Sequence, residues 1–236
     1  MSVSTCDNDK QLEQTTQLTN GQTILGGNEE EKEEKKLNFL KMSGNNKRLF
    51  IMLALSVFSC GSGYSLLAPF YPLEAEKKGV SQTIIGLVFS VFSIVSFCAS
   101  PIIGGMLTIL GAKFVCVAGL GLAGCSSLLF GVLDKCPSGT PFIVLSFIVR
   151  VVEALGALGV VISSSSIASC QFPDNVSTVV AILAAFYCIG LMIGPTIGGL
   201  LYELGGFGLP FWAVGAAILL AGVIIFITLP PQHGKY

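Results

Sequence analysis

The sequence predicts an all-α membrane protein in which six transmembrane helices form a 3+3 inverted repeat. Three observations lead to this prediction. The chain of 236 residues is 52% hydrophobic and only 11% charged, with a mean hydropathy of +0.78, whereas soluble domains carry about a quarter charged residues. Its apolar residues gather in successive runs of about 20 residues, the length of a transmembrane helix. One eleven-residue phrase occurs twice.

Residues 1–48 are predicted to form a disordered cytosolic tail. They are rich in Gln, Thr, Asn, Glu and Lys and include the charged run EEEKEEKK at 29–36. A segment of this composition cannot bury enough apolar surface to fold. No apolar core follows a short basic start, so we do not expect a signal peptide.

Residues 49–230 are expected to form the transmembrane domain, followed by a short cytosolic end at 231–236. The first run ends at the charged join LEAEKKGVS, the second at GAK, the third at DKCPSGT, the fourth at SCQFPDN and the fifth at ELGGFG. Each join is polar or rich in turn-forming residues. The spans are therefore placed at 49–72, 82–107, 113–133, 141–166, 176–202 and 209–230.

The repeated phrase is PIIGGMLTILG at 101–111 and PTIGGLLYELG at 195–205, and the two copies are identical at seven of eleven positions. The first copy closes the second span and the second copy closes the fifth. Three crossings lie between them, so the copies leave the membrane on opposite faces. This is the pattern of two inverted three-helix units, an arrangement suited to alternating access.

The second copy belongs to a glycine stripe formed by Gly190, Gly194 and Gly198, which recur every four residues on one helix face. Glycines at this spacing let another helix approach closely. Pro195 lacks an N–H and frees the carbonyl of Leu191, so we expect a bend there. The stripe then serves either for ordinary close packing of two helices or as a seal or hinge between them, and it can do both.

Two motifs in this region resemble those of the major facilitator superfamily. GLMIGPTIGG at 190–199 resembles the antiporter motif of its proton-coupled exchangers, with Gly199 as the last motif glycine. Arg150 and Glu153 lie in a phrase, RVVEALG, that is similar to the superfamily's RxxqGxG motif, with Glu in the place of Gln.

The join between the second and third spans resembles the superfamily's GxLaDrxGRk loop motif. Gly104, Gly111 and Lys113 match that pattern, whereas Thr108 stands in place of the Asp and Ala112 in place of the first Arg. The charged latch attributed to this loop is therefore in doubt here.

Three longer phrases, at 68–86, 129–139 and 163–180, are similar to the vesicular amine transporters, and among them to the polyamine carriers. The resemblance implies proton-coupled antiport of organic cations such as polyamines or monoamines. It also implies that this chain corresponds to the N-terminal six-helix half of a twelve-helix fold.

Arg150 and Glu153 are the only ionised residues away from the ends of the predicted spans, and three residues apart they share a helix face. A charge at the bilayer centre costs roughly 2.5–3.5 kcal/mol, so it usually faces a cavity or a partner. Glu153 either accepts protons or an organic cation, with Arg150 adjusting its proton affinity, or the two form a neutralised structural pair. For Arg150 we favour structure or gating.

Tyr64 and Tyr187 are further site candidates, because a tyrosine ring can face a cationic amine. Interface anchoring and core packing are the alternatives. Monoamine carriers are expected to carry an acidic residue in the first span, and this chain has none there. A cation site would then rely on the fourth span or on a second half.

Basic residues near the span ends predict that both termini are cytosolic. Seven lie on the side of the tail, against three on the other side, Lys77, Lys78 and Lys135. The sequon at Asn175 would then face the cytosol and stay unmodified. The membrane is expected to be vesicular, another endomembrane or the plasma membrane.

The residue inventory excludes several classes of function. The single histidine, His233, lies near the end, and the eight cysteines form no CxxC pair. We therefore expect no enzyme activity, no metal, no cofactor and no nucleic-acid partner. The expected partners are a small organic cation, protons and the lipid bilayer.

A second reading is a truncated, non-transporting half that pairs with or regulates a full-length carrier. On six helices alone, Arg150 and Glu153 would face lipid and the glycine stripe would lose the surface it meets. This predicts a homodimer or a complementary six-helix half.

Overall fold

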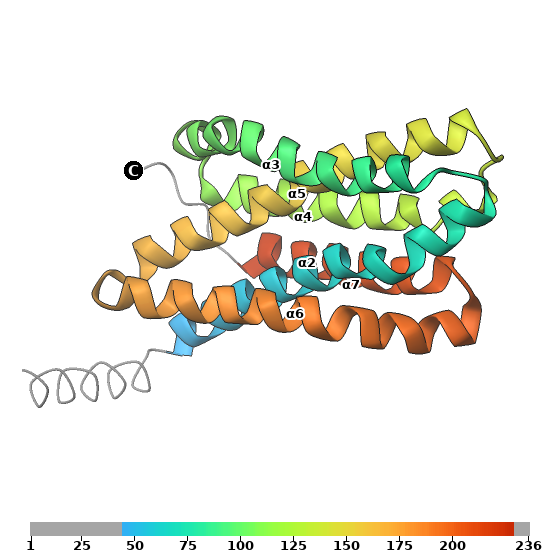
Figure 1. Ribbon diagram of the computed structural model, residues 1–236. Helices are drawn as coiled ribbons and strands as arrows, with labels where there is room; N and C mark the ends of the chain where they lie inside the picture. Colours follow the sequence, from blue (N-terminus) through green and yellow to red (C-terminus); the bar gives the residue numbers. More distant parts are fainter. Residues whose placement is uncertain (1–43, 229–236) are drawn as a thin grey trace, which may run out of the picture. The chain divides into compact units, whose positions relative to one another are not determined.

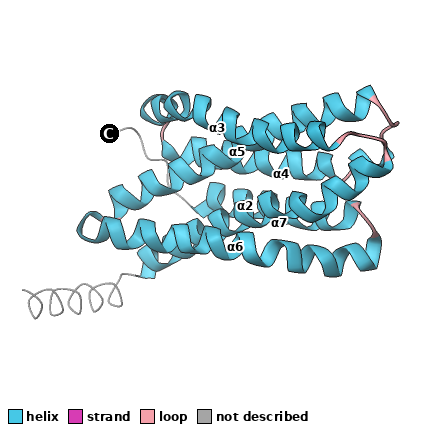
Figure 2. Cartoon of the chain, viewed as in Figure 1, coloured by secondary structure: helices cyan, strands magenta, loops and turns pink. Residues whose placement is uncertain are grey.

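The computed structural model describes residues 44–228. The predicted tail thus lies outside the described residues as far as position 43, and the predicted end 231–236 lies outside them entirely. Contacts divide the chain after Gly44, and the helices belong to the unit Asn45–Tyr236. All regular structure in the described part is helical (Figure 2).

Six long helices match the six predicted spans, and each is long and apolar enough to cross a membrane. They are α2 (Gly44–Lys77), α3 (Gln82–Leu110), α4 (Ala112–Phe130), α5 (Thr140–Gln171), α6 (Val176–Gly205) and α7 (Gly208–Thr228). Two short 3-10 turns, η1 (Leu133–Lys135) and η2 (Pro173–Asn175), lie before α5 and α6.

The first span was predicted too short at both ends. It was placed at 49–72, but α2 starts at Gly44, so residues 44–48 are helical, and it continues through Pro72 to Lys77. The phrase LEAEK at 73–77 is composed of good helix formers, which continue the helix beyond the apolar run. High hydropathy marks the part of a helix that lies in lipid. The helix itself can continue into the polar region where the residues have a high helix propensity.

The helices fall into two similar triplets, which supports the 3+3 repeat. Their lengths are 34, 29 and 19 residues for α2, α3 and α4, and 32, 30 and 21 residues for α5, α6 and α7. The start of α2 and the end of α7 lie at the same end of the bundle (Figure 1). The middle helices of the triplets, α3 and α6, are the least buried. Within the most apolar stretch of each helix, 17% of the residues are buried inside the structure.

A glycine with a positive φ ends the helix at each copy of the repeated phrase, but one position later in the second copy. Gly111 follows α3 with a φ of 82°, and its N–H donates to the Leu107 carbonyl at 3.0 Å. Gly206 follows α6 with a φ of 73°, and its N–H donates to the Tyr202 carbonyl at 2.8 Å. A positive φ favours glycine at both places. Gly111 is the last residue of the first copy, whereas Gly206 follows the second copy, whose last residue, Gly205, is still helical.

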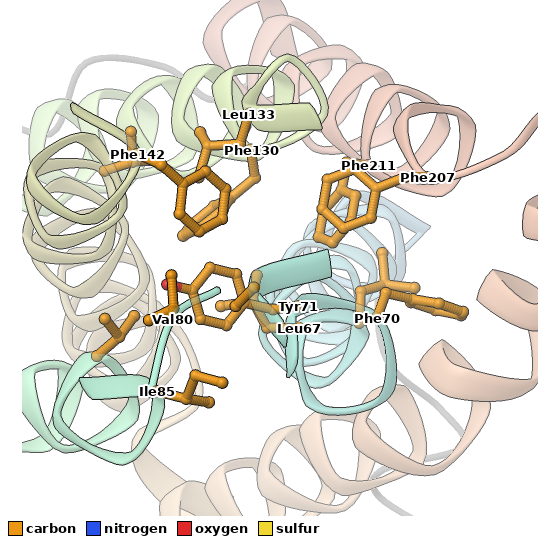
Figure 3. Packing of buried hydrophobic residues seen from close by; sticks show 14 residues of the cluster. Leu67, Phe70, Tyr71, Val80, Ile85, Phe130, Leu133, Phe142, Phe207 and Phe211 are labelled. Atoms are coloured by element: carbon orange, nitrogen blue, oxygen red, sulfur yellow. The ribbon is translucent and has the colours of Figure 1, made fainter. Parts of the chain in front are cut away.

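A cluster of buried apolar residues, many of them aromatic, forms a core (Figure 3). Phe70 and Tyr71 place it near the end of α2. Tyr71 is fully buried there and stacks on Phe142, with ring centroids 6.0 Å apart. Phe89 and Phe130 meet the Tyr71 ring edge-on. This cluster joins α2 to α3, α4 and α5.

Lys78 covers this cluster from the join between α2 and α3. Its Nζ donates to the backbone carbonyls of Asp134 at 2.8 Å and Cys136 at 2.7 Å, and lies 5.3 Å from the centre of the Phe142 ring. One lysine therefore ties the end of α2 to the join between α4 and α5.

Candidate functional site

The predicted pair on the fourth span is an ion pair buried inside the six-helix bundle. Nη1 of Arg150 donates to Oε2 of Glu153 at 2.7 Å. Arg150 is 0% exposed and Glu153 is 5% exposed. The spacing of three residues on α5 makes this contact local, as the sequence indicated.

Aromatic rings enclose the guanidinium of Arg150. Its Cζ lies 4.7 Å from the ring centre of Phe92, 4.9 Å from that of Tyr64 and 5.6 Å from that of Phe89. These distances are those of cation–π contacts, which strengthen when the cation is desolvated. Tyr64, expected as a ring for an external cation, here faces a cation of the protein itself.

The expectation that six helices alone would turn Arg150 and Glu153 towards lipid is wrong. Helices α2 and α3 supply the rings of Tyr64, Phe89 and Phe92, which cover the pair. An ionised group in lipid is costly, and this packing shields both charges within the chain. Nε and Nη2 of Arg150 have no hydrogen-bond partner among the described residues, so Glu153 and the rings alone balance its charge.

A cavity of about 310 Å³ lies beside the pair, between α2, α3, α5 and α6. Phe92 belongs to both places, since its ring faces Arg150 and also lines the cavity. Tyr187 lines the cavity from α6, and Ala157, one turn after Glu153, lines it from α5. Phe92 thus joins the wall of the cavity to the ion pair.

The cavity is apolar apart from a few small polar groups. Ser164 is one of them, and its buried hydroxyl has no hydrogen-bond partner among the described residues. Neighbouring serines behave differently, because Ser163 and Ser165 donate to carbonyls of their own helix at 2.6 and 2.9 Å. Ser164 is therefore a polar group placed at the cavity wall, and sequence analysis did not single it out.

The glycine stripe of α6 packs on α2. Gly190, Gly194 and Gly198 are buried, and a Cβ added to each would collide respectively with Phe58, with Ser65 and with Leu66. The stripe thus meets a helix of the same six-helix unit, so the expectation that it lacks a partner surface is wrong. Gly199 has open space around it, and Pro195 lies inside the uninterrupted α6.

Serines of α2 form the opposing surface. Ser62 and Ser65 donate to the carbonyls of Phe58 at 3.0 Å and Ser62 at 3.1 Å. Their hydroxyls are satisfied within α2, so the contact with the α6 glycines needs no hydrogen bonds between the two helices.

The residues of the loop motif lie at and around the join between α3 and α4. Gly104 has open space around it, and the exposed Thr108 hydroxyl donates to the Gly105 carbonyl at 2.7 Å within α3. Lys113 places its Nζ 5.5 Å from the ring centre of Phe226 on α7. These side chains lie apart from the ion pair and the cavity, while Gly111 ends the helix as described above.

Sequence analysis also missed the rings that hold Arg150. Phe89 and Phe92 are three residues apart and so share a face of α3. That spacing was a usable signal, but nothing in it indicates which helix the face meets.

Comparison with known proteins settles the family. Residues 53–235 match the Major Facilitator Superfamily, which is most of the chain. The chain belongs to this superfamily. Together with the six apolar helices, this makes it a multi-pass membrane protein.

Several members of the major facilitator superfamily are similar over most of this chain. The MFS-type transporter SLC18B1 of Homo sapiens is 41% identical over 188 residues, which are 79% of this chain and 41% of that protein. The vesicular acetylcholine transporter of Mus musculus is 24% identical over 175 residues, 73% of this chain and 31% of that protein. Multidrug resistance protein 1 of Bacillus subtilis is 28% identical over 194 residues, 80% of this chain and 46% of that protein. The chain spans less than half the length of these relatives.

Proposed function

We propose that this chain takes part in proton-coupled antiport of organic cations, such as polyamines or monoamines, by alternating access. The observation that carries the proposal is the buried pair of Arg150 and Glu153 beside a cavity lined by Phe92 and Tyr187. The cavity supplies apolar and aromatic surface for an amine, and the pair supplies the carboxylate.

Exchange follows from competition for the carboxylate of Glu153. A proton or an amine cation can each neutralise this group, and each displaces the other. Arg150 balances the carboxylate when neither is bound, and the two side chains are 2.7 Å apart. A buried charge without a partner is costly, so in this proposal Arg150 holds the carboxylate between the release of one cation and the binding of the other.

The inverted repeat would supply the movement. Two similar triplets can rock about a site near the midplane, so that the cavity opens to one face at a time. In this proposal the close contact of the α6 glycines with α2 acts as a seal between α2 and α6.

The names of the relatives support the substrate class. One is a vesicular carrier of acetylcholine, which is an organic cation, and another is a multidrug resistance protein. The polyamine preference rests on the sequence phrases at 68–86, 129–139 and 163–180.

The test is uptake of radiolabelled spermidine into proteoliposomes that hold an imposed pH gradient. Uptake should require the gradient and stop on addition of a protonophore. The double variant Arg150→Met, Glu153→Leu keeps the site neutral and should abolish uptake, whereas Glu203→Gln, an exposed carboxyl at the end of α6, should leave it intact. Uptake that ignores the gradient, or survives in the double variant, would refute the proposal.

A second candidate is a half that pairs with another copy or with a complementary half, or that regulates a full-length carrier. The exposed apolar side chains of α3 and α6 favour it, among them Phe97 at 84%, Met192 at 76% and Leu204 at 81%. Purified protein in mild detergent should then be a dimer by detergent-corrected mass and by crosslinking. A monodisperse monomer that transports spermidine would contradict this candidate, and a dimer that transports nothing would favour it over antiport.

We further propose that both termini face the cytosol, in a vesicular membrane, another endomembrane or the plasma membrane. The excess of basic residues on the side where α2 begins supports this orientation.

A further inference from the structure

A second hollow lies along α2 and α6. It is an apolar groove of about 300 Å³, lined by Phe50, Ile51, Ala54, Leu55, Phe58, Phe186 and Ile189. None of these residues lines the cavity beside the ion pair. The groove is therefore separate from the cavity at the candidate substrate site.

Two exposed cations lie at one end of this groove. Lys47 and Arg48 precede Phe50 and Ile51 on α2. Lys47 lies three residues before Phe50 and four before Ile51, and Arg48 lies three residues before Ile51. Residues at these spacings are neighbours on a helix, so both cations share the helix face that forms the groove. Neither cation forms an ion pair with an acidic side chain within residues 44–228.

The two cations and the apolar groove match the headgroup and the acyl chain of a phospholipid. Lysine and arginine near a helix end extend towards the membrane interface, where they meet headgroups. An apolar groove that continues from there into the membrane suits an acyl chain. We propose that the groove between α2 and α6, with Lys47 and Arg48 at its end, binds one anionic phospholipid from the bilayer.

Charge favours an anionic lipid over a zwitterionic one. A basic residue near an anionic membrane surface strengthens binding by about fivefold, so two together give about 30-fold. A zwitterionic lipid with the same acyl chains would fill the groove equally well but would gain little from the cations. The headgroup charge is therefore the variable that the experiment should change.

The experiment is native mass spectrometry of the full purified chain in detergent micelles. Palmitoyl-oleoyl phosphatidylserine and palmitoyl-oleoyl phosphatidylcholine are titrated separately. The unmodified chain should retain one phosphatidylserine at a concentration about 30-fold below that needed for phosphatidylcholine. The variant Lys47→Gln, Arg48→Gln should lose this preference, while Lys77→Gln, Lys135→Gln, at the opposite end of the bundle, should keep it.

A second variant tests the groove independently of charge. Ile189 is 42% exposed and lines the groove, so Ile189→Trp should fill it and weaken retention of phosphatidylserine. Met192 lies on the same helix outside the lining, and Met192→Trp should have no effect. Equal retention of the two lipids by the unmodified chain would overturn the proposal. So would phosphatidylserine retention that is unchanged both in Ile189→Trp and in Lys47→Gln, Arg48→Gln. A dimer that covers the groove and retains no lipid would also overturn it. Transport plays no part in the readout, so the result is independent of the proposed antiport.

Discussion

Gly194 of α6 lies against Ser62 of α2 so closely that no methyl group fits between them. A Cβ at Gly194 would come within 2.8 Å of the Ser62 carbonyl oxygen. Gly199, in the same motif, has nothing within 4 Å of the position its Cβ would take. The two glycines therefore offer a matched test of whether the motif acts through close packing.

We expect Gly194→Leu to destabilise the bundle and Gly199→Leu to leave it unchanged. Overpacking a tight contact typically costs about 1–3 kcal/mol. Thermal unfolding in mild detergent, followed by the fluorescence of Trp212, the single tryptophan, measures the difference. Equal stability of the two variants would contradict the close contact of α6 with α2.

The ion pair predicts a large difference between single and double variants. Glu153→Gln leaves the guanidinium of Arg150 buried without a counter-charge, which should cost about 3–5 kcal/mol of stability. The double variant Arg150→Met, Glu153→Leu should restore most of this loss, because apolar replacement of a buried pair is often neutral. Chemical denaturation of the three proteins checks the order; a double variant as unstable as Glu153→Gln would refute it.

Lys77 and Lys78 are neighbours at the end of α2, but we expect them to contribute unequally to stability. Lys78→Met removes the donor shared by the Asp134 and Cys136 carbonyls and should cost about 1.5–3 kcal/mol, the range for a hydrogen bond to a charged group. It should also speed proteolysis within residues 131–139. Lys77→Met breaks exposed contacts, among them the surface pair with Glu74, and should change nothing measurable. Comparable effects of the two changes would exclude the bridging role of Lys78.

Two native cysteines test the proposed orientation. Cys170 is exposed at the end of α5, and Cys136 is half-buried at the opposite end of the bundle. On vesicles whose cytosolic face is outward, a membrane-impermeant maleimide should label Cys170 at once and Cys136 only after permeabilisation. Peptide mass spectrometry identifies the labelled residue. The reverse order, or a glycan on Asn175, would place the termini on the other side.

The sequence by itself predicted the six membrane-spanning helices found in residues 44–228, their approximate bounds and the proximity of Arg150 and Glu153. Each depends on residues close together in the chain: hydropathy over about 20 positions marks a span, and a spacing of three places two side chains on one helix face. The repeated phrase also predicted the two triplets, which the helix lengths support. The bend at Pro195 stays a prediction.

Only the tertiary structure decided what these elements meet. A glycine stripe fits any helix with a flat face, so nothing in residues 190–198 identifies α2 as its partner. The same holds for Arg150, whose enclosing rings come from α2 and α3. Such contacts join residues far apart in the chain, and they depend on how whole helices pack rather than on any local pattern. For this reason the sequence left Arg150 and Glu153 facing lipid, whereas the fold encloses both charges within the bundle.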